Sequence, residues 1–248
     1  MLIEQIKTRR TIRQYKNRPV EDSLLHQLLV AASRTQTMGN LQLYSVVVTR
    51  DEEKKRQLSP AHFGQPMVMQ APVVLTICAD FNRTSQWCRC RQTEPGYDNM
   101  LSFINAASDA LLYAQTLSSL AEEAGLGVCY LGTTVYSPQV IIDVLQLPKL
   151  VMPIATLTLG WPDEEPAQCD RLPVEAILHN EAYTDYTPER IDKFYAEKEA
   201  LPENQHFVEI NGKETLAQVF AEIRYTKRDN EALSKNFFEV LRRQGFVD

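Results

Sequence analysis

Hydrophobic and polar positions in the first two thirds of the chain follow two different patterns. Short runs of β-branched and apolar residues predict four strands, at 44–49, 72–79, 127–131 and 153–159. The run at 72–79 (PVVLTICA) is almost wholly apolar, which indicates a strand buried on both faces. Apolar residues at helical spacing predict helices between and before these strands, over 2–8, 23–35, 52–58, 98–124 and 138–145.

Polar residues at the helix starts support these boundaries. Asp22 and Asp51 are suited to cap the second and third predicted helices, and Asp98 is suited to cap the long one. Ser137 followed by Pro138 has the order that is preferred at a helix start.

The remaining third of the chain is mostly helical, with patterns near 174–178, 188–199, 214–227 and 229–244. Residues 81–97, which contain Trp87, Cys88 and Cys90, show no regular pattern and predict an irregular insert. Together the elements predict an α+β fold, with helices around a small central sheet. We expect one core over residues 1–180 and a helical extension of the same domain over residues 181–248.

Composition places the chain among ordinary globular proteins, with 44% hydrophobic and 23% charged residues. The net charge of −6 argues against a general nucleic-acid binder, which normally presents a basic domain. No apolar stretch is long enough to span a bilayer, no secretory signal is visible, and five scattered cysteines do not form a disulfide framework. We therefore expect a cytoplasmic protein that binds neither nucleic acid nor membrane.

The charge is unevenly distributed along the chain. The first twenty residues carry six basic side chains and one acid, so the other 228 residues sum to −11. Arg9, Arg10, Thr11 and Arg13 lie within five residues, and arginine suits bidentate recognition of phosphate. From spacing alone, the favoured explanation is a solvated loop that places cations near a helix C-terminus.

Other candidate chemistry is sparse. The glycines between 125 and 132 permit close approach of a ligand to the backbone, or they end a helix and turn the chain. The four histidines are scattered, Cys88 and Cys90 lack a second pair at zinc spacing, and no Walker A or G-x-S-x-G motif occurs. Glu122 and Glu123 are expected on a solvated face of the long helix. We expect no metal site and no catalytic side chain.

Several short motifs occur in a defined order along residues 1–180. They are Arg9-Arg10-Thr11-Ile12-Arg13 with Tyr15 and Pro19-Val20, Asn40-Leu41-Gln42, Gly64-Gln65, residues 78–83, residues 125–132, residues 159–162 and Arg171-Leu172-Pro173. In order and spacing, these motifs resemble the nitroreductase superfamily of FMN-dependent oxidoreductases. The resemblance is greatest to the branch of oxygen-insensitive NAD(P)H nitroreductases and flavin reductases.

The resemblance implies a mixed central sheet flanked by helices, in an interlocked homodimer with two FMN sites at its interface. It implies that the FMN phosphate and nearby polar atoms are held by Arg9, Arg10, Thr11, Arg13 and Arg171. It implies that the flavin ring contacts Thr37, Gln65, Tyr130, Leu131, Gly132 and Thr133. The implied reaction passes hydride from NADPH or NADH through flavin N5 to a small-molecule electron acceptor, such as a nitroaromatic or quinone, by a ping-pong mechanism.

Two of the chain's departures from the family pattern remove a basic residue. Leu131-Gly132-Thr133-Thr134-Val135 stands where the branch often has Ile-Gly-Gly-x-Arg, and Cys169-Asp170-Arg171 stands where it often has Lys-Pro-Arg. Three alternatives stay open: a flavin reductase or azoreductase on the same scaffold, an FMN-binding sensor with little turnover, and a protein whose basic segment binds an acidic partner without flavin.

Overall fold

The computed structural model describes residues 2–248, which divide into two compact units. The first unit comprises the chain up to Gln168 together with Leu233–Asp248, and the second comprises Cys169–Ala232. Helix α11 (Lys227–Gln244) begins in the second unit and ends in the first. The expected division of one domain at residue 180 stays a prediction.

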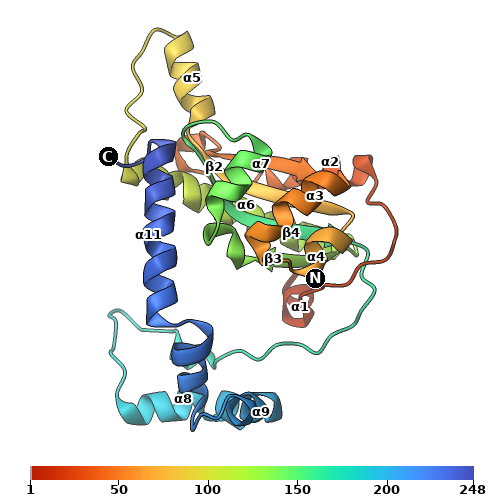
Figure 1. The fold of residues 1–248 in the computed structure, drawn as a ribbon, viewed down its shortest axis with the longest axis vertical. Helices are drawn as coiled ribbons and strands as arrows, with labels where there is room; N and C mark the ends of the chain where they lie inside the picture. Colours follow the sequence, from red (N-terminus) through yellow and green to blue (C-terminus); the bar gives the residue numbers. More distant parts are fainter. Residues whose placement is uncertain (1) are drawn as a thin grey trace. The chain divides into compact units, whose positions relative to one another are not determined.

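A four-stranded sheet lies at the centre of the first unit (Figure 1). Its strands are β1 (Tyr44–Thr49), β2 (Val73–Asp80), β3 (Gly127–Leu131) and β4 (Val151–Gly160). Their order is β1-β2-β4-β3, and each hydrogen-bonded pair is antiparallel. The expected α+β class is confirmed, but the sheet of the described residues is antiparallel rather than mixed. The reason is that the connections from β1 to β2 and from β3 to β4 begin and end at the same end of the sheet.

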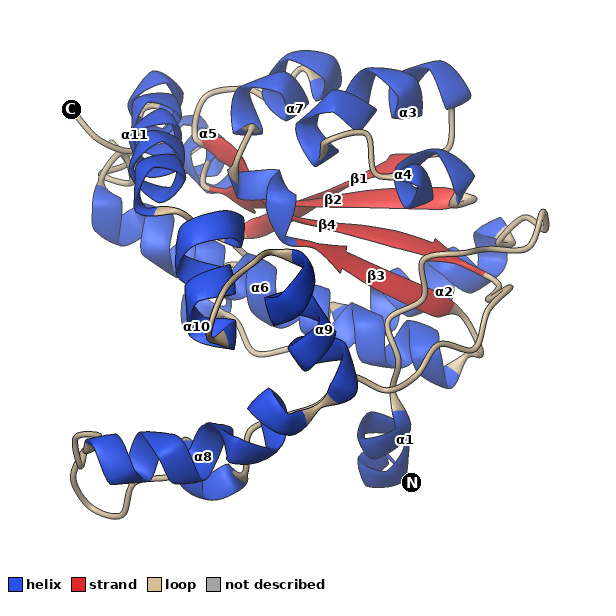
Figure 2. Cartoon of the chain, turned by 60° about the horizontal axis from the view of Figure 1, so that its bottom comes forward, coloured by secondary structure: helices blue, strands red, loops and turns tan. Residues whose placement is uncertain are grey.

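Helices cover both faces of this sheet (Figure 2). One face carries α2 (Asp22–Ala32) and α6 (Met100–Glu123), and the other carries α3 (Glu52–Leu58), α4 (Pro66–Gln70) and α7 (Pro138–Leu145). The inward side of α6 presents fully buried small residues, among them Ala106, Ala110 and Ala114, which join the main core with β2 and β4. Small side chains bring the axis of α6 close to the sheet.

The first unit has five more short elements, and one of them corrects the sequence analysis. They are α1 (Leu2–Thr8), α5 (Asn82–Cys90) and the 3₁₀ segments η1 (Met38–Asn40), η2 (Ser59–His62) and η3 (Gly132–Val135). Helix α5 occupies the segment that was expected to be irregular. Its buried stripe consists of Thr84, Ser85 and Cys88, small residues that a hydropathy pattern does not reveal.

The helix caps agree with the sequence analysis only in part. Asp51 caps α3 by accepting from the Lys54 amide at 2.8 Å. The long helix is capped by Asn99, one residue after the expected Asp98, through a 3.0 Å bond from the Ser102 amide. Asp22 is the first residue of α2 rather than its cap, and its carboxylate pairs with Arg50 at 2.8 Å instead of making a cap bond. Ser137 precedes α7 but makes no cap bond.

The second unit is helical. It contains η4 (Val174–Ala176), α8 (Pro188–Ala200), α9 (Pro202–Ile210), α10 (Leu216–Gln218), the π-helix η5 (Val219–Arg224) and the first turns of α11. Helix α9 was not expected, because its residues are mostly polar and partly exposed, with no buried side chain. Within residues 2–248, no helix combines the length and the apolar character needed to cross a membrane.

Candidate functional site

The basic segment Arg9–Lys16, here called the arm, lies along the edge of the sheet formed by β3 and the end of β4. The Ile12 amide donates to the Val128 carbonyl at 3.1 Å, and the Lys16 amide donates to the Trp161 carbonyl at 2.8 Å. The Tyr15 hydroxyl donates to the Ile12 carbonyl at 2.7 Å and lies 2.7 Å from the Thr158 hydroxyl. Burial raises the pKa of Tyr15, so this hydroxyl stays protonated and keeps its donor.

Two strand glycines allow the arm to lie directly on the sheet. A Cβ at Gly127 would stand 2.6 Å from the Ile12 side chain, and a Cβ at Gly160 would stand 2.9 Å from Tyr15. Both distances are far below van der Waals contact, so any larger residue would displace the arm. Gly127, which the sequence analysis considered for close approach of a ligand, instead makes room for the arm.

A small apolar cluster joins the arm to two other segments that carry predicted site residues. Its members are Ile12, Tyr15, Met67, Val68, Ala71, Val74, Cys129 and Leu131. Met67 and Val68 belong to α4, which begins directly after Gln65, and Leu131 ends β3. The cluster therefore brings the arm together with α4, which follows Gln65, and with the end of β3.

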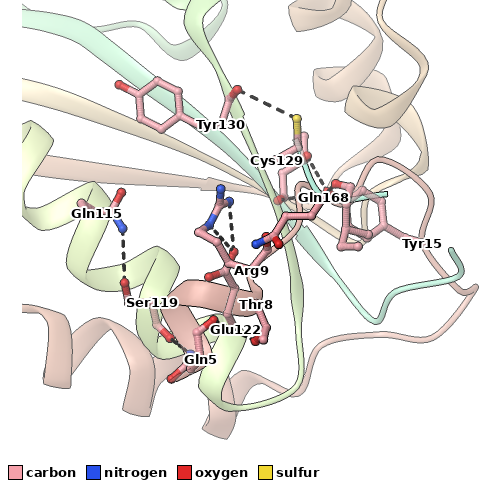
Figure 3. Close-up of polar contacts among 12 residues, drawn as sticks. Gln5, Thr8, Arg9, Tyr15, Gln115, Ser119, Glu122, Cys129, Tyr130 and Gln168 are labelled. Atoms are coloured by element: carbon pink, nitrogen blue, oxygen red, sulfur yellow. Dashed lines mark hydrogen bonds and ion pairs between the residues drawn. The ribbon is translucent and has the colours of Figure 1, made fainter. Parts of the chain in front are cut away.

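Two of the predicted phosphate-binding arginines face carboxylates of the chain itself. The Arg9 guanidinium lies 3.1 Å from Glu122 of α6, with side-chain exposures of 29% and 12% (Figure 3). Arg10 lies 3.2 Å from the exposed Glu165. The expectation of a solvated Glu122 was wrong, because the C-terminal end of α6 lies beside the arm and covers this side chain.

Arg13 differs from its two neighbours. Its backbone amide and that of Gln14 donate to the Glu164 carboxylate, the latter at 3.0 Å. Its side chain is exposed, and no carboxylate of residues 2–248 lies within ion-pair distance of the guanidinium. The guanidinium lies beside the Cys129 thiol. Burial raises the pKa of this thiol, and the positive charge of Arg13 partly offsets the rise. Thr11, between these arginines, is half-buried.

The end of β3 presents an open surface next to Arg13. The Tyr130 side chain is 44% exposed, while Leu131 is buried in the apolar cluster. Gly132 is exposed, and a Cβ there would meet nothing within 4 Å. The following residue, Thr133, is half-buried, and its hydroxyl lies 2.9 Å from Nδ1 of His62.

Gln65 reaches the same region from η2 and α4. Its amide donates to the His62 carbonyl at 3.1 Å, and its side chain is half-buried. Gly64 before it is exposed, with no atom within 4 Å of a built Cβ. Gly64 and Gly132 therefore leave space at this surface rather than filling it.

Thr37 lies apart from these residues. Its hydroxyl donates to Asp109 at 2.5 Å and accepts from the Gln42 amide at 2.9 Å. Asp109 is fully buried on α6 and also accepts from the amides of Met38 and Leu43. No hydrogen bond in residues 2–248 joins Thr37 to the other candidate residues. Within one chain, its hydrogen bonds hold its own loop against α6.

Arg171 belongs to the second unit. Its guanidinium donates to the neighbouring Asp170 carbonyl at 2.7 Å. The Asp170 carboxylate pairs with Lys198 of α8 at 2.8 Å. The acid that replaces the usual proline of the family pattern is thus compensated by a lysine from within the same unit.

Three residues of this region escaped the sequence analysis. Asp109 is a charged residue on the inward side of α6, between Ala106 and Ala110, and that position is a signal that could have found it. Glu164 sits in an acidic run that predicts solvation, and His62 has no local signal. His62 is fully buried, its Nε2 has no partner, and burial lowers its pKa to about 4.

Within residues 2–248, no group of three or more histidine, cysteine or acidic side chains is arranged to hold a metal ion. The site therefore consists of cations, an exposed strand end and glycine turns, held together by apolar packing. Such an arrangement is chemically suited to an anionic group.

Comparison with known proteins identifies relatives of this chain. The Nitroreductase family model matches residues 6–161. An FMN reductase (NAD(P)H) of Bacillus subtilis strain 168 is 32% identical over 252 residues, covering 96% of this chain and 98% of its own. An oxygen-insensitive NADPH nitroreductase of Salmonella typhimurium is 33% identical over 181 residues, covering 73% of this chain and 74% of its own.

A solved structure has the same fold as this chain. The crystal structure of a Bacteroides fragilis NCTC 9343 protein superimposes with a TM-score of 0.98 at 61% sequence identity, covering 99% of this chain and 100% of that one. The resemblance found in the sequence is thereby confirmed. The chain belongs to the nitroreductase family of oxidoreductase enzymes.

Proposed function

We propose that this chain binds FMN and passes hydride from NADPH or NADH to a small-molecule acceptor, such as a nitroaromatic or a quinone. The observation that carries the proposal is Arg13, an exposed cation without an ion-pair partner in residues 2–248, beside the open end of β3 at Tyr130–Gly132. The relatives named as an FMN reductase and an NADPH nitroreductase support it.

The residues present suit FMN, which combines a dianionic phosphate with a flat ring. Arg13 offers an uncompensated charge, and the exposed pair of Arg10 with Glu165 is easily exchanged for phosphate. The unfilled space at Gly64 and Gly132 accommodates a flat group against the backbone. FMN supplies the two-electron chemistry when it is bound, and the chain binds and orients it.

We assign the predicted residues to two sides of this site. Arg10, Thr11 and Arg13 serve the phosphate side, and Arg9, whose guanidinium is paired to Glu122, fixes the arm beside them. The role of Arg171, which belongs to the second unit, stays a prediction. Gln65, Tyr130, Leu131, Gly132 and Thr133 serve the ring side. Donor and acceptor use the surface at Tyr130 and Gly132 in turn, which makes the kinetics ping-pong.

We also propose that two chains associate. The outer side of α6 exposes Leu101 (67%) and Ile104 (51%), and Leu111 continues this stripe at helical spacing. Contiguous exposed apolar residues of this kind mark an interaction surface. In a homodimer, the loop of Thr37, which the Asp109 bonds anchor to α6, would lie at the interface and reach the site of the second copy.

A flavin reductase is the second candidate. Its support is the B. subtilis protein named FMN reductase, which matches this chain over almost its whole length. On this alternative, free flavin replaces the nitroaromatic as acceptor at the same surface.

The proposal is tested with the purified protein. We expect a yellow dimer that releases FMN on denaturation, and whose colour bleaches under anaerobic conditions with NADH or NADPH. Adding a nitroaromatic should restore the colour, and adding free FMN in a parallel sample tests the flavin reductase. A colourless protein that cannot be reconstituted with FMN would refute the proposal, and failure to bleach with either donor would favour a binding protein.

A further inference from the structure

His62 connects two segments of the candidate ring surface. Its side chain, at the end of η2, bonds through Nδ1 to the Thr133 hydroxyl in η3 at 2.9 Å. Its backbone carbonyl accepts the amide of Gln65 at 3.1 Å. One fully buried residue therefore contacts both the residue after Gly132 and the residue at the start of α4.

The burial of His62 decides which of its nitrogens carries the proton. Burial lowers its pKa to about 4, so the ring is neutral at pH 7 and has one N–H. Nε2 has no partner, and an orphaned buried N–H is rarer than an orphaned acceptor. We infer the tautomer with the hydrogen on Nδ1, which donates to the Thr133 oxygen.

This tautomer leaves the hydroxyl hydrogen of Thr133 unused. The oxygen accepts from His62, and no acceptor within the described chain takes the Thr133 hydrogen. The neighbouring Thr134 differs, because its hydroxyl donates to the Leu131 carbonyl at 2.7 Å inside the fold. Thr133 is half-buried and directly follows the exposed Gly132, which places this hydroxyl beside the open surface.

We propose that His62 is a positioning residue that makes Thr133 a directed hydrogen-bond donor to the ring bound at Gly132. The inference rests on the FMN site proposed above. A donor at a ring atom that gains negative charge on reduction stabilises the reduced form more than the oxidised form. At such an atom the pair raises the reduction potential of the bound flavin as well as its affinity.

The test uses FMN-loaded protein and four variants. Thr133→Val removes the donor at nearly constant shape, and Thr133→Ser keeps it. His62→Leu removes the partner, and His62→Asn keeps a polar atom close to the place of Nδ1. The measurements are the FMN dissociation constant, the absorption spectrum and midpoint potential of the bound flavin, and the melting temperature of the apoprotein.

We expect Thr133→Val and His62→Leu to weaken FMN binding by about fivefold to thirtyfold and to make the midpoint potential more negative. Thr133→Ser and His62→Asn should recover most of both effects. The double variant should be no worse than the more affected single one, because the two residues act as one pair. Thr133 is only half-buried, so its two variants stay informative even if His62→Leu fails to fold.

A purely structural role would lower the melting temperature of His62→Leu while leaving the flavin spectrum and potential of Thr133→Val unchanged, and that result would overturn the inference. Failure of the proposed function is recognised separately. If the unaltered protein does not bind FMN, both proposals fall. If it binds FMN and Thr133→Val behaves as the unaltered protein does, only the role of His62 and Thr133 falls.

Discussion

Replacing Gly127 by alanine tests the seating of the arm on the sheet. The added Cβ would lie 2.6, 2.7 and 2.9 Å from Cγ2, Cβ and Cγ1 of Ile12. These atoms form the stem of a β-branched side chain, which cannot rotate away from its own backbone. The arm itself must therefore move until these contacts lengthen to about 3.4 Å.

Forcing an extra carbon into a packed site costs about 1–3 kcal/mol. For a chain of this size, a loss of about 2 kcal/mol lowers the melting temperature by roughly 4–8 °C. The displaced arm carries Arg10 and Arg13, so FMN binding should weaken as well. Differential scanning fluorimetry gives the first quantity, and a flavin fluorescence titration gives the second.

The matched control is Gly96→Ala, where a Cβ meets nothing within 4 Å and the backbone is not left-handed. This variant should melt and bind FMN as the unaltered protein does. If Gly127→Ala also leaves both quantities unchanged, the arm does not lie against β3 and the argument for the site is refuted.

Three further predictions concern single side chains. Arg13→Ala should raise the FMN dissociation constant about tenfold to hundredfold, because it removes charge-assisted bonds. Arg56→Ala on α3, where the arginine pairs with Glu53, is the control. Equal constants for both variants would contradict the phosphate assignment. Asp109→Asn should lower the free energy of unfolding, measured by urea denaturation, by about 2 kcal/mol, because the buried carboxylate accepts from Thr37, Met38 and Leu43. An unchanged urea midpoint would contradict this prediction. The pKa of His62 falls from 6.5 to about 4 on folding. Between these two pH values His62 is protonated in the unfolded chain and neutral in the folded one. Lowering the pH from 6.5 to 4 should therefore remove roughly 3 kcal/mol from the free energy of unfolding. The variant His62→Asn has no imidazole to protonate and should not show this loss. Parallel pH dependences of unfolding in both proteins would contradict that prediction.

Local pattern was sufficient for the strands. The runs at 44–49 and 127–131 are bounded by polar residues and glycine, and the structure begins and ends β1 and β3 at these residues. Pattern failed where burial involves residues that are not apolar. Helix α5 buries Thr84 and Ser85 while Trp87 is exposed, so large hydrophobic residues do not mark its buried side. The cap of α6 was misplaced by one residue because Asp98 and Asn99 are both good caps, and only backbone geometry distinguishes them.

The candidate site was predictable as a set of segments but not as a set of contacts. The motifs located the arm, Gln65 and Tyr130–Thr133, and the apolar cluster brings these together. Pairing of Arg9 with Glu122 joins residues 113 positions apart, and no local pattern encodes it. The bond between His62 and Thr133 is of the same kind, since it spans 71 positions. It also gives the threonine at the departure from the Ile-Gly-Gly-x-Arg pattern a buried partner.

The basic arm and the acidic remainder of the chain meet at the site, and this changes how its charges are interpreted. Glu122 and Glu165 pair with Arg9 and Arg10, and Glu164 accepts from the backbone of the arm near Arg13. Exposed ion pairs contribute little, so phosphate can replace Glu165 at small cost. The Arg9 pair is largely covered, and breaking it would leave Glu122 with 12% exposure and no partner. Arg9 is therefore better suited to fixing the arm against α6, while Arg10 and Arg13 carry the charge that an incoming phosphate meets.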